Sequence, residues 1–185
     1  MEKILELDGK ILLWIQNNLR SDVMNTIEKF ITNFGGFIAA TMVLMIIIPK
    51  TRRLGIMTFA ANFMADMLAN GVLKKLVERV RPYEVVEGLT SVIGAMSSTS
   101  FPSGHSACSF AIATVIFLET KKKVGIPALI LAAMIASSRL YLGVHYPTDV
   151  LAGITVGVLS GCFTSFVYHR FIEKKIGKKK EVPAA

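Results

Sequence analysis

The sequence predicts an all-α fold, a polytopic transmembrane helical bundle of about five spans with an amphipathic helix in front of it. Hydrophobic residues make up 52% of the 185 residues and charged residues only 18%, whereas a soluble domain carries about 25% charged residues. The apolar residues stand in long unbroken blocks rather than alternating with polar ones. Tight clusters of lysine and arginine separate the blocks, as in membrane proteins.

Residues 1–29 are predicted to form an amphipathic segment on the membrane surface. The apolar run Ile11–Ile15 is too short for a signal peptide, and acidic residues are interspersed around it. Six apolar residues fall near one helical face, which suits a helix lying in the interface: Ile4, Leu5, Ile11, Leu12, Ile15 and Leu19. A sixth transmembrane helix is the alternative for this segment.

Five apolar blocks approach the roughly 20 residues needed to cross a hydrocarbon core. They are Phe30–Ile48, Leu54–Leu73, Ser103–Leu118, Val124–Leu142 and Val150–Tyr168. The third block is the shortest. We therefore predict one membrane-embedded domain over residues 1–185, ending in a flexible basic tail at residues 174–185.

The basic residues divide unequally between the two ends of the predicted bundle. One end receives twelve of them, in clusters at residues 50–53, 121–123 and 170–180, and the other end receives nine. The positive-inside rule places the twelve-residue end, with the C-terminus, in the cytoplasm of a cell-membrane protein. The same clusters account for the net charge of +8, so no nucleic-acid partner is expected. No obligatory protein partner is evident.

Three groups of polar residues fall together at the other, extracytoplasmic end. Three permanent cations near the membrane boundary require an anion, and the arginine fork suits phosphate oxygens. Backbone N–H groups at the start of the third block also favour a phosphate, with Pro102 suited to its first turn. The groups are Lys74 with Arg81-Pro82, Pro102-Ser103-Gly104-His105, and Ser138-Arg139 with His145 and Asp149.

Two histidines complete this constellation. Asp149 follows His145 by one helical turn, so it can accept the ring N–H and leave the other nitrogen free to attack phosphorus. His105 would then protonate the leaving oxygen and later activate water against a phosphohistidine. No His, Cys, Asp or Glu cluster has metal-ligand spacing, and neither a metal nor a cofactor is expected.

Together the three groups resemble the signature K-x6-R-P, P-S-G-H and S-R-x5-H-x3-D of the type 2 phosphatidic acid phosphatase superfamily. Every signature position matches, and the stretch from Lys74 to Asp149 covers about two-fifths of the chain. The resemblance implies an all-helical bundle, usually of six helices, that dephosphorylates lipids. It implies that His145 is the nucleophile, His105 the acid and Asp149 the residue that orients His145. It also implies phosphate binding by Lys74, Arg81, Ser103, Gly104 and Arg139.

Other polar residues near these groups are interpreted as structural. Asn62, Asp66, Asn70 and Lys74 are four apart and form one stripe, which we expect to face the bundle interior and to bond neighbouring helices. Asn70 is expected to help place Lys74. Lys75 and Arg79 stand outside the signature and fit membrane-flanking charge.

The function predicted from these residues is removal of phosphate from a lipid phosphate or diphosphate, with membrane lipids as the surroundings. Undecaprenyl diphosphate suits an outward-facing site; phosphatidic acid and phosphatidylglycerol phosphate are alternatives. An anion-binding transporter or channel is the alternative of another class, and it would need charged or broken helices at mid-membrane. A vanadium haloperoxidase shares the motifs, but those enzymes are large and soluble.

Overall fold

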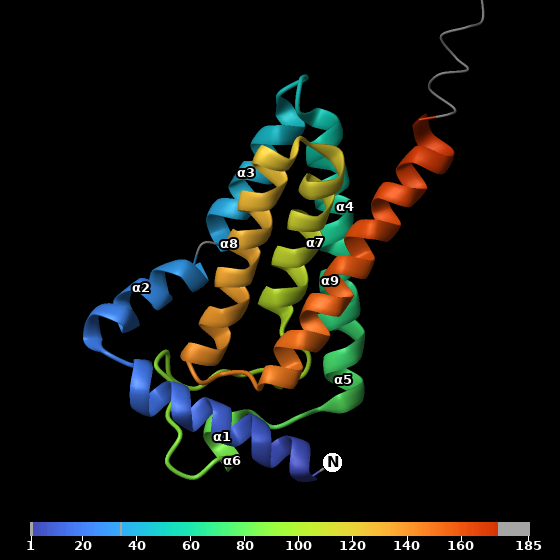
Figure 1. The fold of residues 1–185 in the computed structure, drawn as a ribbon. Coiled ribbons are helices and arrows are strands. Elements are labelled where there is room, and N and C mark those ends of the chain that lie inside the picture. The colour runs from blue at the N-terminus through green and yellow to red at the C-terminus, as the bar shows by residue number, and fades with distance from the viewer. Residues whose placement is uncertain (1, 34, 174–185) are drawn as a thin grey trace, which may run out of the picture.

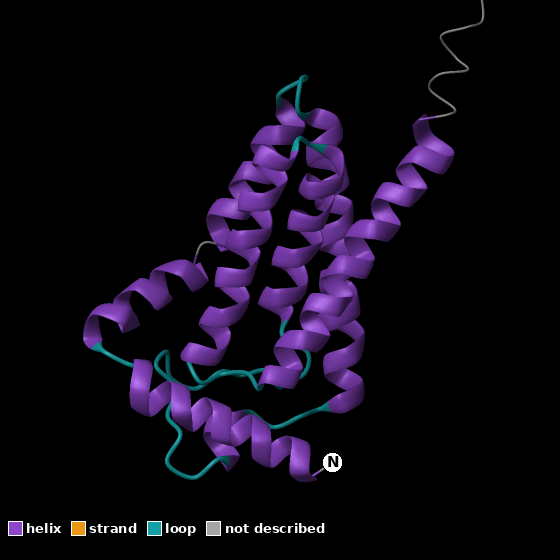
Figure 2. Cartoon of the chain, in the orientation of Figure 1, coloured by secondary structure: helices purple, strands orange, loops and turns teal. Residues whose placement is uncertain are grey.

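The computed structural model describes residues 2–33 and 35–173, and this part of the chain is helical with no strand (Figure 2). The helices follow one another in the order α1 (Glu2–Leu19), α2 (Asp22–Asn33), α3 (Gly35–Ile47), α4 (Arg52–Asp66), the π-helix η1 (Met67–Leu73), α5 (Lys74–Val77), α6 (Pro82–Val85), α7 (Gly104–Glu119), α8 (Lys122–Tyr141), α9 (Pro147–Val167) and the π-helix η2 (Tyr168–Glu173). The all-α prediction is confirmed. The predicted tail at residues 174–185 lies outside the described residues.

Each of the five predicted blocks is largely helical, and the second one comprises α4 and η1. Within residues 2–33 and 35–173, three helical stretches are long and apolar enough to cross a membrane. These are Arg52–Val85, Lys122–Tyr141 and Pro147–Glu173. The helices α7 and α3 are shorter, with 16 and 13 residues. Large apolar side chains on the outside of the bundle remain exposed, as lipid-facing residues do, among them Phe59, Phe63, Leu151, Leu159 and Phe163.

The bundle has two different ends (Figure 1). The connections 48–51 and 120–121 and the last turns of η2 lie at one end, which carries the basic clusters. The long connection 78–103 and the short connection 142–146 lie at the opposite end. The three groups of candidate residues therefore meet at one end, as the apolar blocks predict.

The N-terminal segment is two helices rather than one, because the chain breaks at residues 20–21 between α1 and α2. The helix α1 lies across the end of the bundle that carries the candidate residues, and α2 leans outward beside it (Figure 1). Leu12 is buried against Leu89 and Tyr146. This contact fixes α1 on the loops of the site.

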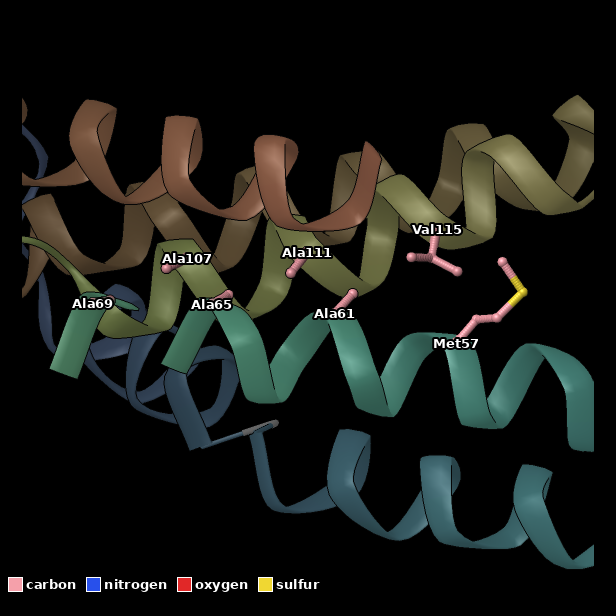
Figure 3. Packing of buried hydrophobic residues seen from close by; sticks show 7 residues of the cluster. All are labelled: Met57, Ala61, Ala65, Ala69, Ala107, Ala111 and Val115. Carbon is pink, nitrogen blue, oxygen red and sulfur yellow. The ribbon is translucent and has the colours of Figure 1, made fainter. Parts of the chain in front are cut away.

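Small residues hold the central helices close together. A cluster of buried residues joins α4 and η1 to α7 (Figure 3), namely Met57, Ala61, Ala65, Ala69, Ala107, Ala111 and Val115. On α9, a Cβ added at Gly153 would collide with the carbonyl oxygen of Ser103, and one at Gly157 with that of Ala107. Backbones this close are what small residues at four-residue spacing allow. The start of α7 is thereby packed against the start of α9.

Candidate active site

A cavity of about 400 Å³ opens at the loop end of the bundle. Five predicted site residues line it: Lys74, Arg81, Gly104, His105 and His145. They come from α5, the 78–103 connection, the first turn of α7 and the connection before α9. Folding thus brings three separate parts of the sequence to one cavity, whose deeper wall includes Asn62, Asp66, Asn70 and Cys108.

Arg81 is the buried cation of this cavity, with only 2% of its surface exposed. Its guanidinium donates to the carbonyl oxygens of Ser98 at 2.7 Å and Val144 at 2.8 Å. One guanidinium nitrogen lies 3.5 Å from Nε2 of His145. Lys74 donates a long hydrogen bond of 3.4 Å to the Ser98 hydroxyl. Arg81 is therefore anchored beside one nitrogen of His145, and both cations bond to the Ser98 hydroxyl.

His145 is buried, and its two ring nitrogens face different partners. Nδ1 lies 3.6 Å from Oδ2 of Asp149, which is beyond hydrogen-bond distance, and it has no other hydrogen-bond partner. Nε2 faces Arg81. Burial lowers the pKa of His145 to about 4, the nearby charges of Arg139 and Arg81 act in the same direction, and Asp149 opposes them. The imidazole is therefore neutral at pH 7, the form in which a histidine ring can act as a nucleophile.

Asp149 is held by contacts other than His145. Its Oδ2 accepts hydrogen bonds from the backbone N–H of Tyr146 at 2.9 Å and from the hydroxyl of Ser100. Asp149 does lie close to His145, as predicted. The helix α9 starts at Pro147 and places Asp149 one turn beyond the histidine. The ring N–H bond itself is not closed in this structure.

The interpretation of Arg79 as membrane-flanking charge is wrong. Its guanidinium is bound to Asp149 at 2.6 Å and to the Thr148 hydroxyl at 2.7 Å. It also reaches Asp8 of α1 at 3.2 Å and stacks over the Tyr146 ring at 3.8 Å. A buried carboxylate needs a partner of opposite charge, and Arg79 is that partner for Asp149.

The start of α7 differs in detail from the prediction. Ser103 is the N-cap, so Pro102 precedes the helix instead of standing in its first turn. The Ser103 side chain is fully buried and accepts hydrogen bonds from the hydroxyl and the backbone N–H of Ser106. It does not line the cavity, whereas Gly104 does.

Asn70 lies against Gly104 and does not reach Lys74. A Cβ at Gly104 would come within 2.7 Å of the Asn70 amide, so glycine is required for this close approach. The amide donates to Asp66 at 2.6 Å within the same helical stretch. The expectation that Asn70 helps place Lys74 is therefore wrong, while the stripe does face the bundle interior.

Arg139 is buried beside the main cavity and lines a neighbouring one with His105. Its guanidinium donates to the Thr32 hydroxyl of α2 and lies 3.7 Å from the Met96 sulfur. Its Nε has no partner. Among residues 2–33 and 35–173, no three His, Cys, Asp or Glu side chains lie close enough together to hold a metal ion.

Known proteins share this fold. Residues 53–173 match the family model of the PAP2 superfamily. The chain belongs to the PAP2 superfamily. Its fold superimposes on the crystal structure of a transmembrane PAP2 type phosphatidylglycerolphosphate phosphatase from Bacillus subtilis with a TM-score of 0.79, 29% identity, and coverage of 92% of this chain and 89% of that one.

Curated PAP2 relatives match over part of their length. Phosphatidylglycerophosphatase B of Bacillus subtilis is 40% identical over 52% of this chain and 50% of its own length. An undecaprenyl-diphosphatase of Sulfolobus acidocaldarius is 30% identical over 72% of this chain and 66% of its own length. The chain thus spans about half to two thirds of the first curated relatives it matches.

Several polar residues of this PAP2 site were not found by sequence reasoning. Asp8, Thr32, Arg79 and Ser100 all bond to signature residues or to Arg79. Their partners lie 49 to 140 residues away along the chain. For Arg79, the sequence signal is its position between the signature residues Lys74 and Arg81.

Proposed function

We propose that this protein is a lipid phosphatase that works through a phosphohistidine at His145. The observation that carries the proposal is a single cavity at the bundle end that holds two cations, Lys74 and Arg81, and two histidines, His105 and His145. Phosphoryl transfer needs charge neutralisation and positioning more than covalent chemistry from the protein. The names of the PAP2 relatives support a lipid phosphate as substrate.

In the first step the neutral ring of His145 attacks phosphorus, forming a P–N bond as the P–O bond to the leaving group breaks. Lys74, Arg81 and Arg139 neutralise the phosphate oxygens, and the backbone at Ser103 and Gly104 supplies N–H donors. Asp149 orients His145 and stabilises the positive charge that forms on it.

In the second step the phosphohistidine is hydrolysed. His105 gives its proton to the leaving oxygen in the first step, so it is then free to take a proton from water. The water oxygen attacks phosphorus, the P–N bond breaks, and inorganic phosphate leaves with His145 restored. The side-chain cations carry the charge neutralisation, and the reaction is expected to require no metal or other cofactor.

The proposed substrate is undecaprenyl diphosphate, approached from the extracytoplasmic side of the cell membrane. The positive-inside distribution supports this orientation and a cytoplasmic C-terminus. Phosphatidylglycerol phosphate and phosphatidic acid are the alternative substrates. An anion transporter is not favoured, because the cations of the cavity stand at one end of the bundle.

The test is phosphate release by the purified protein in detergent, with undecaprenyl diphosphate, phosphatidylglycerol phosphate and phosphatidic acid in parallel. We expect release from at least the first lipid, inhibition by vanadate, full activity in EDTA and none in His145→Ala. No release from any of the three lipids would overturn the proposed function.

A further inference from the structure

A second cavity of about 510 Å³ lies next to the proposed catalytic cavity and shares His105 with it. Its polar walls are Lys29 and Thr32 of α2, Arg139 of α8 and His105 of α7. Its apolar walls are Val92, Ile93 and Met96. Met96 and His105 line both cavities, so the proposed general acid stands at the boundary between them.

The charge of this second cavity is positive. Lys29 and Arg139 contribute two cations, and none of its lining residues is acidic. Lys29 stands one helical turn before Thr32 on α2, and Thr32 accepts the hydrogen bond from Arg139. Lys29 therefore belongs to the face of α2 that meets Arg139.

Neither cation forms an ion pair with a carboxylate of the described residues 2–33 and 35–173. Arg139 is 1% exposed, and its Nε has no hydrogen-bond partner. The side chain of Lys29 is exposed and makes no hydrogen bond or ion pair with any residue of the described ranges 2–33 and 35–173. A buried guanidinium without a carboxylate is costly. It points to anions from outside the protein, namely the scissile phosphate assigned to Arg139 above and, on the side of Arg139 that faces Lys29, a second one.

We propose that this second cavity binds a second phosphate group of the lipid substrate, with Lys29 as a specificity-determining residue. The inference rests on the proposed function. When His145 attacks the terminal phosphorus of a diphosphate, the bridging P–O bond breaks and the bridging oxygen departs on the lipid monophosphate. His105 protonates that oxygen, so the departing phosphate must lie beside His105, where the second cavity begins.

The same cations can also bind a second phosphate that is not part of the leaving group. In phosphatidylglycerol phosphate the additional phosphate is a diester, separated from the scissile group by a glycerol. Phosphatidic acid and a prenyl monophosphate have no second phosphate at all. Neutralising a departing phosphate lowers the barrier to its release. We therefore expect a higher kcat/KM for substrates that carry a second phosphate.

Two matched pairs of substrates test the inference: farnesyl diphosphate against farnesyl monophosphate, and phosphatidylglycerol phosphate against phosphatidic acid. The variant Lys29→Met removes the charge and keeps most of the stem, and Lys29→Arg keeps the charge. The control is Lys75→Met, an exposed lysine at the same end of the bundle that lines neither cavity.

For Lys29→Met we expect kcat/KM to fall about tenfold on the substrate with two phosphates and less than about twofold on its partner with one. Lys29→Arg and Lys75→Met should keep the wild-type ratio. A loss confined to the farnesyl pair assigns the cavity to the departing phosphate, and one confined to the glycerolipid pair assigns it to the diester.

Equal losses on both members of both pairs, or no loss on any, would overturn the inference. Neither result tests the proposed function, because that function depends on the activity of the wild-type protein. A wild-type protein inactive on all four substrates and on undecaprenyl diphosphate would instead defeat the proposed function itself.

Discussion

Arg79 and Asp149 form an ion pair of 2.6 Å, with the carboxylate fully buried. The same carboxylate faces Nδ1 of His145 at 3.6 Å. Arg79 therefore holds the acid that stands behind the proposed nucleophile. A second carboxylate, Asp8 of α1, lies on the other side of Arg79 at 3.2 Å, which connects the N-terminal helix to the catalytic end of the bundle.

The first prediction concerns Arg79 as a positioning residue. In Arg79→Met, Asp149 loses its charged partner, so the orientation of His145 is weakened, and we expect kcat to fall about 10- to 100-fold with little change in KM. Arg79→Lys should recover part of this loss. Kinetics with p-nitrophenyl phosphate, beside the exposed control Lys75→Met, measure the effect; wild-type kcat in Arg79→Met would contradict this role.

The second prediction concerns the attachment of α1. Asp8 is 3% exposed and accepts hydrogen bonds from Arg79 and from the Thr148 hydroxyl at 2.5 Å. We expect Asp8→Ala to lower the free energy of unfolding by about 2 kcal/mol, as loss of a buried charged hydrogen bond does. Thermal unfolding in detergent measures this. The matched control is Glu6→Ala, an exposed acid on the same helix, which should leave the melting temperature unchanged.

The fold was largely predictable from the sequence because apolar blocks and basic clusters are local signals. The signature residues Lys74, Arg81, His105 and His145 could be placed at one end because topology follows from the order of the blocks. The order of the blocks does not determine which of these side chains line the same cavity. Arg139 and Ser103 belong to the same signature, yet neither lines the main cavity.

The remaining features depend on contacts between distant parts of the chain. Arg79 is one basic residue among several at a helix end, and only the approach of α9 and α1 makes it the partner of two buried carboxylates. The second cavity likewise joins Lys29 and Thr32 of α2 to residues more than 50 positions later in the chain. The π-helix at Met67–Leu73 likewise has no local signal that we recognised.

The third prediction concerns the protonation of His145. Because burial lowers its pKa to about 4, the ring is neutral above that pH and becomes charged as the pH falls through it. NMR titration of a His105→Gln, His169→Gln variant isolates His145. We expect a midpoint near 4; a midpoint near the ordinary value of about 6.5 would contradict the environment described here.

The fourth prediction concerns orientation in the membrane. Glu87→Cys places a thiol on the exposed 78–103 connection, and Lys50→Cys places one at the opposite end. In a background carrying Cys108→Ala and Cys162→Ala, an impermeant maleimide should label position 87 in intact cells and position 50 only after lysis. The reverse pattern would place the active site in the cytoplasm.

The fifth prediction separates the two histidines and tests the central claim that His145 attacks phosphorus. General acid assistance contributes about 10²–10⁴-fold and matters least for an acidic leaving group such as nitrophenolate. His105→Ala should therefore be severely impaired on a lipid monophosphate but should still form the phosphoenzyme from p-nitrophenyl phosphate. His145→Ala should be inactive on both.

The most direct measurement is single-turnover release of nitrophenolate by each variant in detergent, followed by mapping of acid-labile phosphate on the quenched protein. We predict a burst of nitrophenolate from His105→Ala with phosphate on the peptide that contains His145, and no burst from His145→Ala. A burst from His145→Ala without one from His105→Ala would contradict the account and exchange the two roles.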